Sequence, residues 1–351
     1  MNQKTDTPPA YIALALQSLC EAVNDCASVE DARARILASI ARMNREIAGS
    51  KAFIGDGVKL AVLPEYALTG FPMGETAAQW RAKAAFDPEG AEYAALAELA
   101  AKHQLYLGGN AYETDPHFPE LYFQACFVIA PDGRTVLRYR RLISMYAPSP
   151  YDVLDRYLDA YGADALFPVA DTEIGRLAAI ASEEILYPEI ARCHAMKGAE
   201  VFIHPTSEAA SPLPTPKNIA KQARAIENLA YVVSANTGGM TGTPIPQNSA
   251  DRGSKIVDPR GLVIAEAAGG PSMCAYGEVD IALVRRARRR AGMPNLFART
   301  PAALYAGEYA RAAIHPANTL ANDGAVSVPG RDFYKARQEK VIEALAKRGV
   351  I

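Results

Sequence analysis

Short apolar runs alternate with amphipathic segments along most of this 351-residue chain. Residues 11–17 have the length and apolar character of a buried strand, and apolar residues then recur at helical spacing after Ser28, which is suited to cap a helix. The alternation returns in the second half, where 177–181 and 201–204 are typical of strands on either side of a helix at 187–197. The expected strands are residues 11–17, 59–64, 105–109, 123–130, 136–139, 177–181, 201–204, 230–235 and 276–281. Two such series in one chain predict an α/β fold in which sheet packs on sheet with helices outside.

The domain organisation follows from the positions of the prolines and glycines. No Pro/Gly/Ser-rich linker separates the two strand–helix series, so we expect one domain over residues 1–290. Residues 291–351 differ because prolines punctuate them, and they close with an amphipathic segment that predicts a helix over 332–348. We expect this C-terminal extension to dock on a partner subunit.

Charge and hydropathy limit the classes of partner. A formal net charge of -2 and a pI near 6.3 provide no field that would attract nucleic acid or anionic lipid. No apolar run approaches the roughly 18 residues that a membrane span needs, and residues 1–9 lack the pattern of a signal peptide. We therefore expect a cytoplasmic protein with no nucleic-acid partner and no membrane partner.

Cysteines, histidines and the basic run do not indicate a metal site. The five cysteines are scattered without CxxC spacing, and the five histidines show no HxH or HExxH pattern. The basic run 285–290 is expected to begin a helix and to form a solvated face or an intersubunit salt-bridge surface. Binding of an anionic substrate or partner is the alternative for that run.

Polar residues stand at three of the expected strand ends, where ligands collect in α/β domains. Glu65 directly follows an apolar strand, so its carboxylate is suited to act as a general base, although a hydrogen-bonded turn carboxylate is the alternative. Arg140 and Arg141 follow the expected strand 136–139 and offer a permanent cation to the cleft, with a surface position as the alternative. Ser182 follows 177–181 and is either a nucleophile or an ordinary strand-end hydroxyl.

In chain order, these three segments resemble the nitrilase, or carbon–nitrogen hydrolase, superfamily. Leu63-Pro64-Glu65-Tyr66 is similar to the segment around the family's general-base glutamate. Tyr139-Arg140-Arg141-Leu142 is similar to its catalytic-lysine segment, with Arg141 at the lysine position. Residues 182–189 are similar to its nucleophile segment, with Ser182 at the cysteine position. Further similar segments are 197–200, 224–228, 234–236, 253–261 and 278–280.

The resemblance implies a four-layer αββα sandwich of the nitrilase type. It also implies a homodimer or larger homo-oligomer, a small-molecule substrate, and neither a metal nor an organic cofactor. Members of the family hydrolyse amides, carbamoyl groups or nitriles through a thioester-type intermediate, and this chain looks closest to the amidase branches.

Two departures from the family pattern change the expected chemistry. A serine hydroxyl is harder to deprotonate than a thiol and normally needs a better base than glutamate, so Ser182 is the poorer nucleophile. Arginine stays protonated, so Arg141 can stabilise an oxyanion or clamp a carboxylate but cannot readily act as an acid. Glu65 keeps the residue type of the family.

Five further residues are candidates for contacts with a substrate. Glu113 and Asp152 are candidates for an additional carboxylate that the resemblance implies near the lysine segment, with loop carboxylates in water as the alternative. Tyr146 would contribute to an aromatic wall, and the backbone N–H of Glu183 would donate to an oxyanion. His204 is expected to line the same cleft as the serine, or to replace the missing base.

Three hypotheses about function follow. The first is a divergent carbon–nitrogen hydrolase with Ser182 as nucleophile, Glu65 as base and Arg141 as an electrostatic clamp. The second is an enzyme without a covalent intermediate, in which Glu65 and Arg141 carry out proton transfer, hydration, cyclisation or ring opening. The third is a noncatalytic binding or regulatory protein on the same scaffold.

Overall fold

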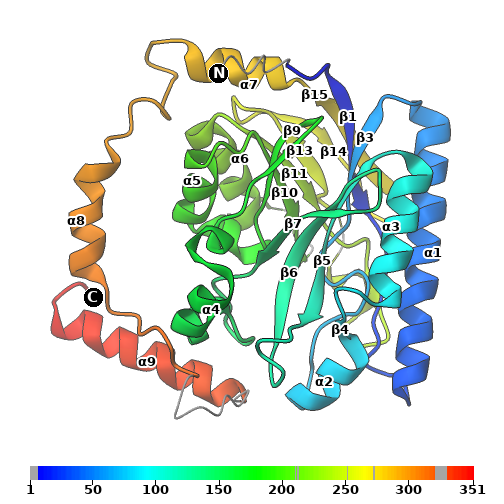
Figure 1. Cartoon of the computed structure of the whole chain (residues 1–351), viewed down its shortest axis with the longest axis horizontal. Coiled ribbons are helices and arrows are strands. Elements are labelled where there is room, and N and C mark those ends of the chain that lie inside the picture. The colour runs from blue at the N-terminus through cyan, green and yellow to red at the C-terminus, as the bar shows by residue number, and fades with distance from the viewer. Residues whose placement is uncertain (1–6, 210, 212, 251, 272, 321–329) are drawn as a thin grey trace.

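Two stacked β-sheets with helices on their outer faces form the body of the molecule in the computed structural model (Figure 1). The structure describes residues 7–351 except 210, 212, 251, 272 and 321–329. The first sheet contains β1 (Tyr11–Gln17), β3 (Val58–Val62), β4 (Ala85–Phe86), β5 (Tyr106–Thr114), β6 (Tyr122–Ile129), β7 (Thr135–Arg140) and β15 (Met273–Val279). Its order is β15-β1-β3-β5-β6-β7, with β4 paired to β5.

The second sheet has the order β14-β13-β11-β10-β9-β8. Its strands are β8 (Ala170–Thr172), β9 (Gly175–Ala179), β10 (Val201–Pro205), β11 (Tyr231–Ala235), β13 (Lys255–Val257) and β14 (Val263–Glu266). A short parallel pair, β2 (Cys20–Glu21) with β12 (Met240–Thr241), lies apart from both sheets in the pairing order. The chain therefore forms the four-layer αββα sandwich that the sequence predicts.

The helices divide between the two outer layers and the C-terminal segment. They are α1 (Val29–Ile54), α2 (Ala77–Ala84), α3 (Ala91–His103), α4 (Leu154–Tyr161), α5 (Pro188–Met196), α6 (Pro216–Asn228), α7 (Ile281–Arg289), α8 (Ala302–Ala312) and α9 (Arg331–Lys347). Helices α1 and α3 pack on the first sheet, and α5 and α6 cover the second (Figure 1). Ser28 caps α1 as predicted, since its side chain accepts a hydrogen bond from Asp31 N at 3.0 Å.

The two sheets approach each other closely where the first sheet carries glycine. A β-carbon at Gly108 on β5 would lie 2.8 Å from the Ile203 Cδ1 atom of β10, which is closer than real side chains pack. Glycine at this position therefore lets the two sheets share one apolar interior. The close contact brings the ends of β3 and β10 to the same edge of the sandwich, where Glu65 N donates to Thr206 O at 3.3 Å.

The basic run lies at the end of a helix, not at its start. Helix α7 begins at Ile281, so the arginines occupy its last turns, where positive charge is favourable beside the negative end of the helix dipole. Arg285 pairs with Glu200 at 2.7 Å, and Arg288 donates to the carbonyl oxygen of Ala199 at 2.5 Å. These two arginines therefore hold α7 against the second half of the domain, while Arg289 is exposed.

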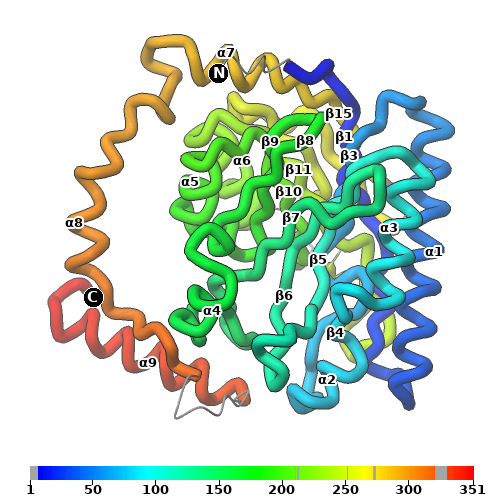
Figure 2. The backbone as a smooth tube through the Cα atoms, in the orientation of Figure 1, coloured from blue at the N-terminus to red at the C-terminus, as the bar shows by residue number. Residues whose placement is uncertain are grey.

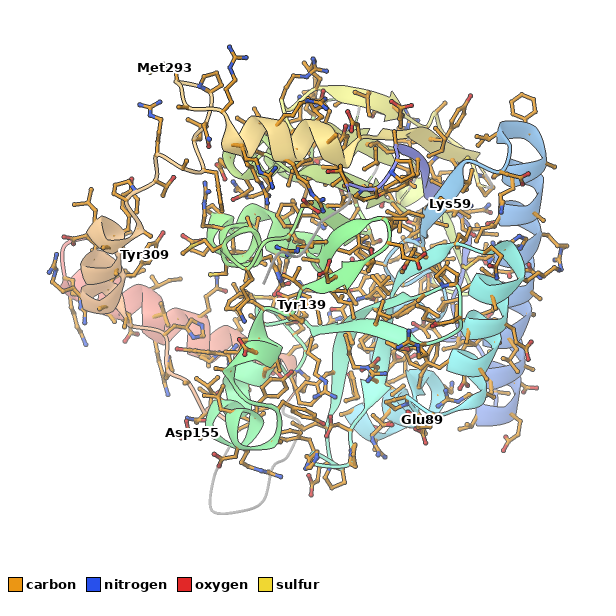
Figure 3. The ribbon with its side chains drawn as sticks, turned by 45° about the horizontal axis from the view of Figure 1, so that its top comes forward. Lys59, Glu89, Tyr139, Asp155, Met293 and Tyr309 are labelled. Atoms are coloured by element: carbon orange, nitrogen blue, oxygen red, sulfur yellow. The ribbon has the colours of Figure 1, made fainter. Side chains whose placement is uncertain are left out.

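The C-terminal segment leaves the body after α7. Helix α8 has no buried residue, and Figure 2 shows it apart from the sandwich. Helix α9 starts near the body and runs back to the end of α8, where Arg348 donates to the Arg311 carbonyl oxygen at 2.9 Å. In Figure 3 Met293 and Tyr309 lie on this outlying arm. Among the described residues, no helix combines the length and apolar character needed to traverse a lipid bilayer.

Candidate active site

Three of the predicted polar residues follow strands that end at one edge of the sandwich. Glu65 lies just beyond β3, Arg141 follows β7 directly, and Ser182 begins a short 3-10 helix, η3 (Ser182–Leu186), after β9. Because β7 and β3 run in the same direction within the first sheet, their ends lie at the same edge. All three side chains are buried, and Glu65 is only 1% exposed.

The guanidinium of Arg141 connects the first sheet to the segment that carries Ser182. Its Nη1 lies 3.5 Å from Glu65 Oε1 and donates to Gln124 Oε1 at 2.8 Å. Its Nη2 pairs with the carboxylate of Glu183, the neighbour of Ser182. Nε donates to the carbonyl oxygen of Ile143 at 2.7 Å. Arg141 thus brings the Glu65 and Ser182 segments together.

The charge on Arg141 is permanent in this setting. Burial alone lowers the pKa of an arginine, but the neighbouring Tyr66, Glu65 and Glu183 outweigh burial and raise the pKa of Arg141 above its ordinary value. Gln124 completes the arrangement, since its Nε2 donates to Glu65 Oε1 at 2.7 Å. Arg141 can therefore stabilise negative charge, but it cannot exchange a proton with a substrate.

The backbone at Ser182 has an uncommon conformation. Its φ is 48°, in the left-handed region that residues with a β-carbon seldom adopt. A strained residue at the junction of a buried strand and a helical turn is a recurrent mounting for a nucleophile, because the turn projects the side chain clear of the strand. The hydroxyl of Ser182 is the group that this turn presents.

A lysine from a distant helix contacts that hydroxyl. Lys217 Nζ donates to Ser182 Oγ at 3.0 Å, and also to the Ser207 carbonyl oxygen at 3.3 Å and Thr206 Oγ1 at 3.4 Å. Thr215 caps α6 by accepting from Asn218 N at 3.2 Å, and this fixes the first turn that carries Lys217. Sequence reasoning did not identify Lys217. The available signal was a lysine in the first turn of a helix that follows a strand ending at this edge.

A second buried pair lies one helical turn further along α6. Lys221 Nζ contacts Glu208 Oε1 at 2.5 Å, and Thr215 Oγ1 donates to the other oxygen of Glu208 at 2.9 Å. Burial lowers the pKa of Lys221 to about 8, against the opposing effect of Glu208. Burial raises the pKa of Glu208, but the charge and hydrogen bond of Lys221 outweigh it and hold that pKa at about 2. A cavity of about 310 Å³ is lined by Glu208, together with Asn236, Lys255 and Glu266.

His204 contacts the backbone of Ser182 and not its hydroxyl. Its Nε2 lies 2.8 Å from the Ser182 carbonyl oxygen, and its Nδ1 lies 2.9 Å from Ser234 Oγ. A carbonyl oxygen only accepts, so Nε2 carries the hydrogen and Nδ1 accepts from Ser234. Burial lowers the pKa of His204 to about 3, so the ring is neutral and both of its nitrogens are engaged. This arrangement supports the shape of the turn at Ser182.

Glu184 holds the Ser182 turn against the end of β7. Its carboxylate accepts from the Tyr139 hydroxyl at 2.7 Å and from the backbone N–H groups of Leu142 and Ile143 at 2.7 and 2.9 Å. Burial raises the pKa of Glu184, although Arg141 and these hydrogen bonds oppose the increase. Figure 3 shows Tyr139 in the interior of the molecule.

The other predicted contact residues lie with different partners. Glu113 on β5 accepts from the Tyr93 hydroxyl of α3 and pairs with Arg138 at 3.0 Å, so its carboxylate faces the outer helical layer. Asp152 is buried and binds the C-terminal segment through Arg337. Tyr146 is 49% exposed, and its ring centroid lies 5.0 Å from the Arg331 guanidinium carbon of α9. The structure therefore groups Glu65, Arg141, Ser182, Glu183 and His204, and it places Glu113, Asp152 and Tyr146 outside this group.

Metal ligands do not cluster in the part of the chain that the structure describes. Among those residues, no group of three or more His, Cys, Asp or Glu side chains is placed to hold a metal ion. The polar groups around Ser182 are instead a serine hydroxyl, two cations and carboxylates engaged by them.

Comparison with known sequences identifies the family. The family model for carbon–nitrogen hydrolases matches residues 18–289. A formamidase from Pseudomonas syringae pv. syringae is 29% identical over 240 residues, which are 68% of this chain and 65% of that protein. An omega-amidase from Saccharomyces cerevisiae is 25% identical over 197 residues, 55% of this chain and 65% of that protein. The match to the nitrilase and fragile histidine triad fusion protein of Caenorhabditis elegans is 29% identical over 190 residues, 53% of this chain and 42% of that protein. The chain thus spans between 42% and 65% of these three relatives' length.

Solved structures share the fold. Nit3 from Saccharomyces cerevisiae, a member of branch 10 of the nitrilase superfamily, aligns with a TM-score of 0.62 at 20% identity, covering 81% of this chain and 94% of that chain. An amidase from Nesterenkonia sp. aligns with a TM-score of 0.57 at 19% identity, covering 85% of this chain and 96% of that chain. At these identities the likeness concerns the arrangement of sheets and helices.

Proposed function

Because this chain belongs to the carbon–nitrogen hydrolase family, we propose that it hydrolyses the C–N bond of a small amide or carbamoyl compound, with Ser182 as the nucleophile. The observation that carries the proposal is the convergence at Ser182. Arg141 bridges Glu65 and the neighbour of the serine, and the serine itself is held in a left-handed turn. Formamidase and omega-amidase relatives support an amide as the substrate class.

The proposed reaction has two stages. Ser182 Oγ attacks the carbonyl carbon, the C–N bond breaks, and the amine leaves with a proton while the acyl group remains on the serine as an ester. Water then attacks the ester, giving the acid and restoring the serine hydroxyl. In this scheme Glu65 accepts the proton of the attacking water.

Arg141 stabilises the negative charge that develops on the substrate oxygen. Its cation is present before the substrate binds, in a buried setting where an electrostatic interaction is stronger than in water. The backbone N–H of Glu183 is proposed as a second donor to that oxygen. These roles replace the lysine and the thiol chemistry of the family with a fixed cation and a hydroxyl.

Ammonia release and intact mass together test this function. The purified chain is incubated with formamide, acetamide, propionamide and a set of N-carbamoyl amino acids, and both the ammonia and the mass of the protein are measured. We expect turnover of at least one amide and an acyl adduct on Ser182. The Ser182→Ala variant should lose at least about 10³-fold in rate, as expected when a nucleophile is removed. Retained turnover by Ser182→Ala would instead support the noncovalent alternative based on Glu65 and Arg141.

A further inference from the structure

The proposed attack by Ser182 requires a proton acceptor in contact with its hydroxyl. A hydroxyl is a much weaker acid than a thiol, so its attack on an amide depends on a base that touches Oγ. Arg141 stands where the family has lysine, and a guanidinium does not accept a proton in proteins. The proton of Ser182 must therefore go to another group.

Glu65 and His204 are the neighbouring candidates for this proton acceptor, and both make hydrogen bonds to other groups. Glu65 Oε1 accepts from Gln124 and lies beside Arg141, and this pairing keeps its carboxylate with the first sheet. His204 carries its hydrogen on the nitrogen that faces the Ser182 carbonyl oxygen, and its other nitrogen accepts from Ser234. Neither contact reaches the Ser182 hydroxyl.

Lys217 does reach that hydroxyl. Its Nζ lies 3.0 Å from Ser182 Oγ, within the distance over which a proton can pass directly. Two other acceptors, Thr206 Oγ1 and the Ser207 carbonyl oxygen, hold the same amine on the loop that follows β10. As an ammonium Lys217 can donate to all three acceptors, and as an uncharged amine it can keep the contacts to Thr206 and Ser207 and turn its lone pair to the Ser182 hydroxyl.

We infer that Lys217 is the general base that takes the proton of Ser182 Oγ, so that the reaction uses a serine–lysine pair formed between η3 and α6. The inference rests on the proposed function, because it names the group that activates its nucleophile. In the reactive form Lys217 is an uncharged amine and the hydroxyl donates to it. The Oγ–C bond forms as the proton moves to Nζ and the carbonyl electron pair moves to oxygen. The resulting ammonium then donates that proton to the nitrogen that leaves when the C–N bond breaks.

The position of Lys217 is set by parts of the chain that do not take part in the chemistry. Pro216 and the Thr215 cap define the first turn of α6, and Lys221 anchors the next turn through Glu208. The anchored helix keeps the Lys217 side chain directed at the turn that begins with Ser182. The pair is therefore preorganised by α6, although 35 residues separate its two members.

A reactive phosphonate tests the pair without knowledge of the substrate. A fluorophosphonate forms an Oγ–P bond with an activated serine, and fluoride leaves while the base takes the proton. The rate of labelling is measured by intact mass and peptide mapping on the full chain. The variants are Lys217→Met, Lys217→Gln and Lys217→Arg, with thermal unfolding recorded for each. Lys197→Met is the matched control, since Lys197 is a more exposed lysine at the end of α5 that pairs with Asp164.

We expect the unaltered chain and Lys197→Met to label at Ser182 at rates within about twofold of each other. All three Lys217 variants should label at least about 10²-fold more slowly, which is the lower range for a general base. Lys217→Arg is decisive because it keeps a cation and hydrogen-bond donors but cannot accept a proton. Labelling by Lys217→Arg within about threefold of the unaltered rate would overturn the inference, and so would absence of Ser182 labelling in the unaltered chain.

The amide assay separates this inference from the proposed function. If the unaltered chain hydrolyses amides through Ser182 while the Lys217 variants remain as reactive as before, only the role of Lys217 is wrong. If amide hydrolysis survives Ser182→Ala while the phosphonate still labels Ser182 in a Lys217-dependent manner, the pair is real and the proposed nucleophilic role in amide hydrolysis is wrong.

Discussion

The Lys217 amine and the Ser182 hydroxyl are hydrogen-bonded at 3.0 Å across two elements that the chain builds separately. Ser182 begins η3 at the end of β9, whereas Lys217 lies in the first turn of α6. This contact places an amine against the hydroxyl of the proposed nucleophile.

The left-handed backbone at Ser182 predicts that two inactive variants at this position differ in stability. Glycine adopts a φ of 48° without strain, so Ser182→Gly should raise the free energy of unfolding relative to Ser182→Ala by about 1 kcal/mol. Both variants lack the hydroxyl and should be inactive. Urea unfolding at neutral pH measures the difference, and a Gly variant less stable than the Ala variant would show that the turn is not strained.

Removal of Arg141 should be strongly destabilising because its carboxylate partner Glu65 is buried. Arg141→Met leaves Glu65, whose side chain is 2% exposed, without its cation, and we expect a loss of about 3 to 5 kcal/mol in the free energy of unfolding. The double variant with Glu65→Gln should recover part of that loss, because the uncompensated charge is gone. A double-mutant cycle by urea unfolding measures this coupling, and purely additive losses would contradict it.

The Glu208–Lys221 pair predicts an acid-dependent loss of stability. The pKa of Glu208 is held at about 2 in the folded chain, below its ordinary value of 4.5. Between these two pH values the folded state therefore binds fewer protons than the unfolded chain. The contribution is complete above an ordinary carboxyl pKa and is lost as the pH falls toward about 2. We expect it to be about 3 kcal/mol.

Glu208→Gln provides the control for this prediction. This variant should be less stable than the unaltered chain at pH 7, because Lys221 loses its buried partner. The difference in free energy of unfolding between the two proteins should decrease steadily as the pH is lowered from 5 to 2. Urea unfolding measures this difference at each pH. If it stays constant over this interval, the acid sensitivity comes from other carboxyl groups.

The Asp152–Arg337 ion pair should hold the C-terminal helix on the body. Asp152 is buried, accepts from Ser149 N at 2.9 Å and Thr319 Oγ1 at 2.9 Å, and pairs with Arg337 of α9. We expect Arg337→Ala to accelerate amide hydrogen exchange across α9 by about tenfold, because local opening becomes easier by about 1.4 kcal/mol. Lys340→Ala, an exposed change in the same helix, should leave exchange unaltered. Faster exchange throughout the sandwich in Arg337→Ala would indicate global destabilisation instead.

Sequence reasoning located much of the fold because the relevant signals are local. Apolar runs at strand length and capping residues such as Ser28 depend on a few neighbouring residues, and the chain order of the motifs around Glu65, Arg141 and Ser182 indicated the αββα arrangement. The local character of these signals also explains why the basic run is expected at the start of a helix, although it lies at the end of α7. The expected strand 276–281 includes Ile281, which begins α7, so the pattern predicts a helix that starts only at the arginines.

By itself, the sequence determined that polar residues 65, 141 and 182 stand at strand ends, because periodicity sets where a strand stops. Only the tertiary structure decided which side chains meet there. Lys217 reaches Ser182, Glu113 turns to the outer helices, and Asp152 binds the C-terminal segment. These outcomes depend on how helices and loops from distant parts of the chain pack, and that packing is a property of the whole sandwich.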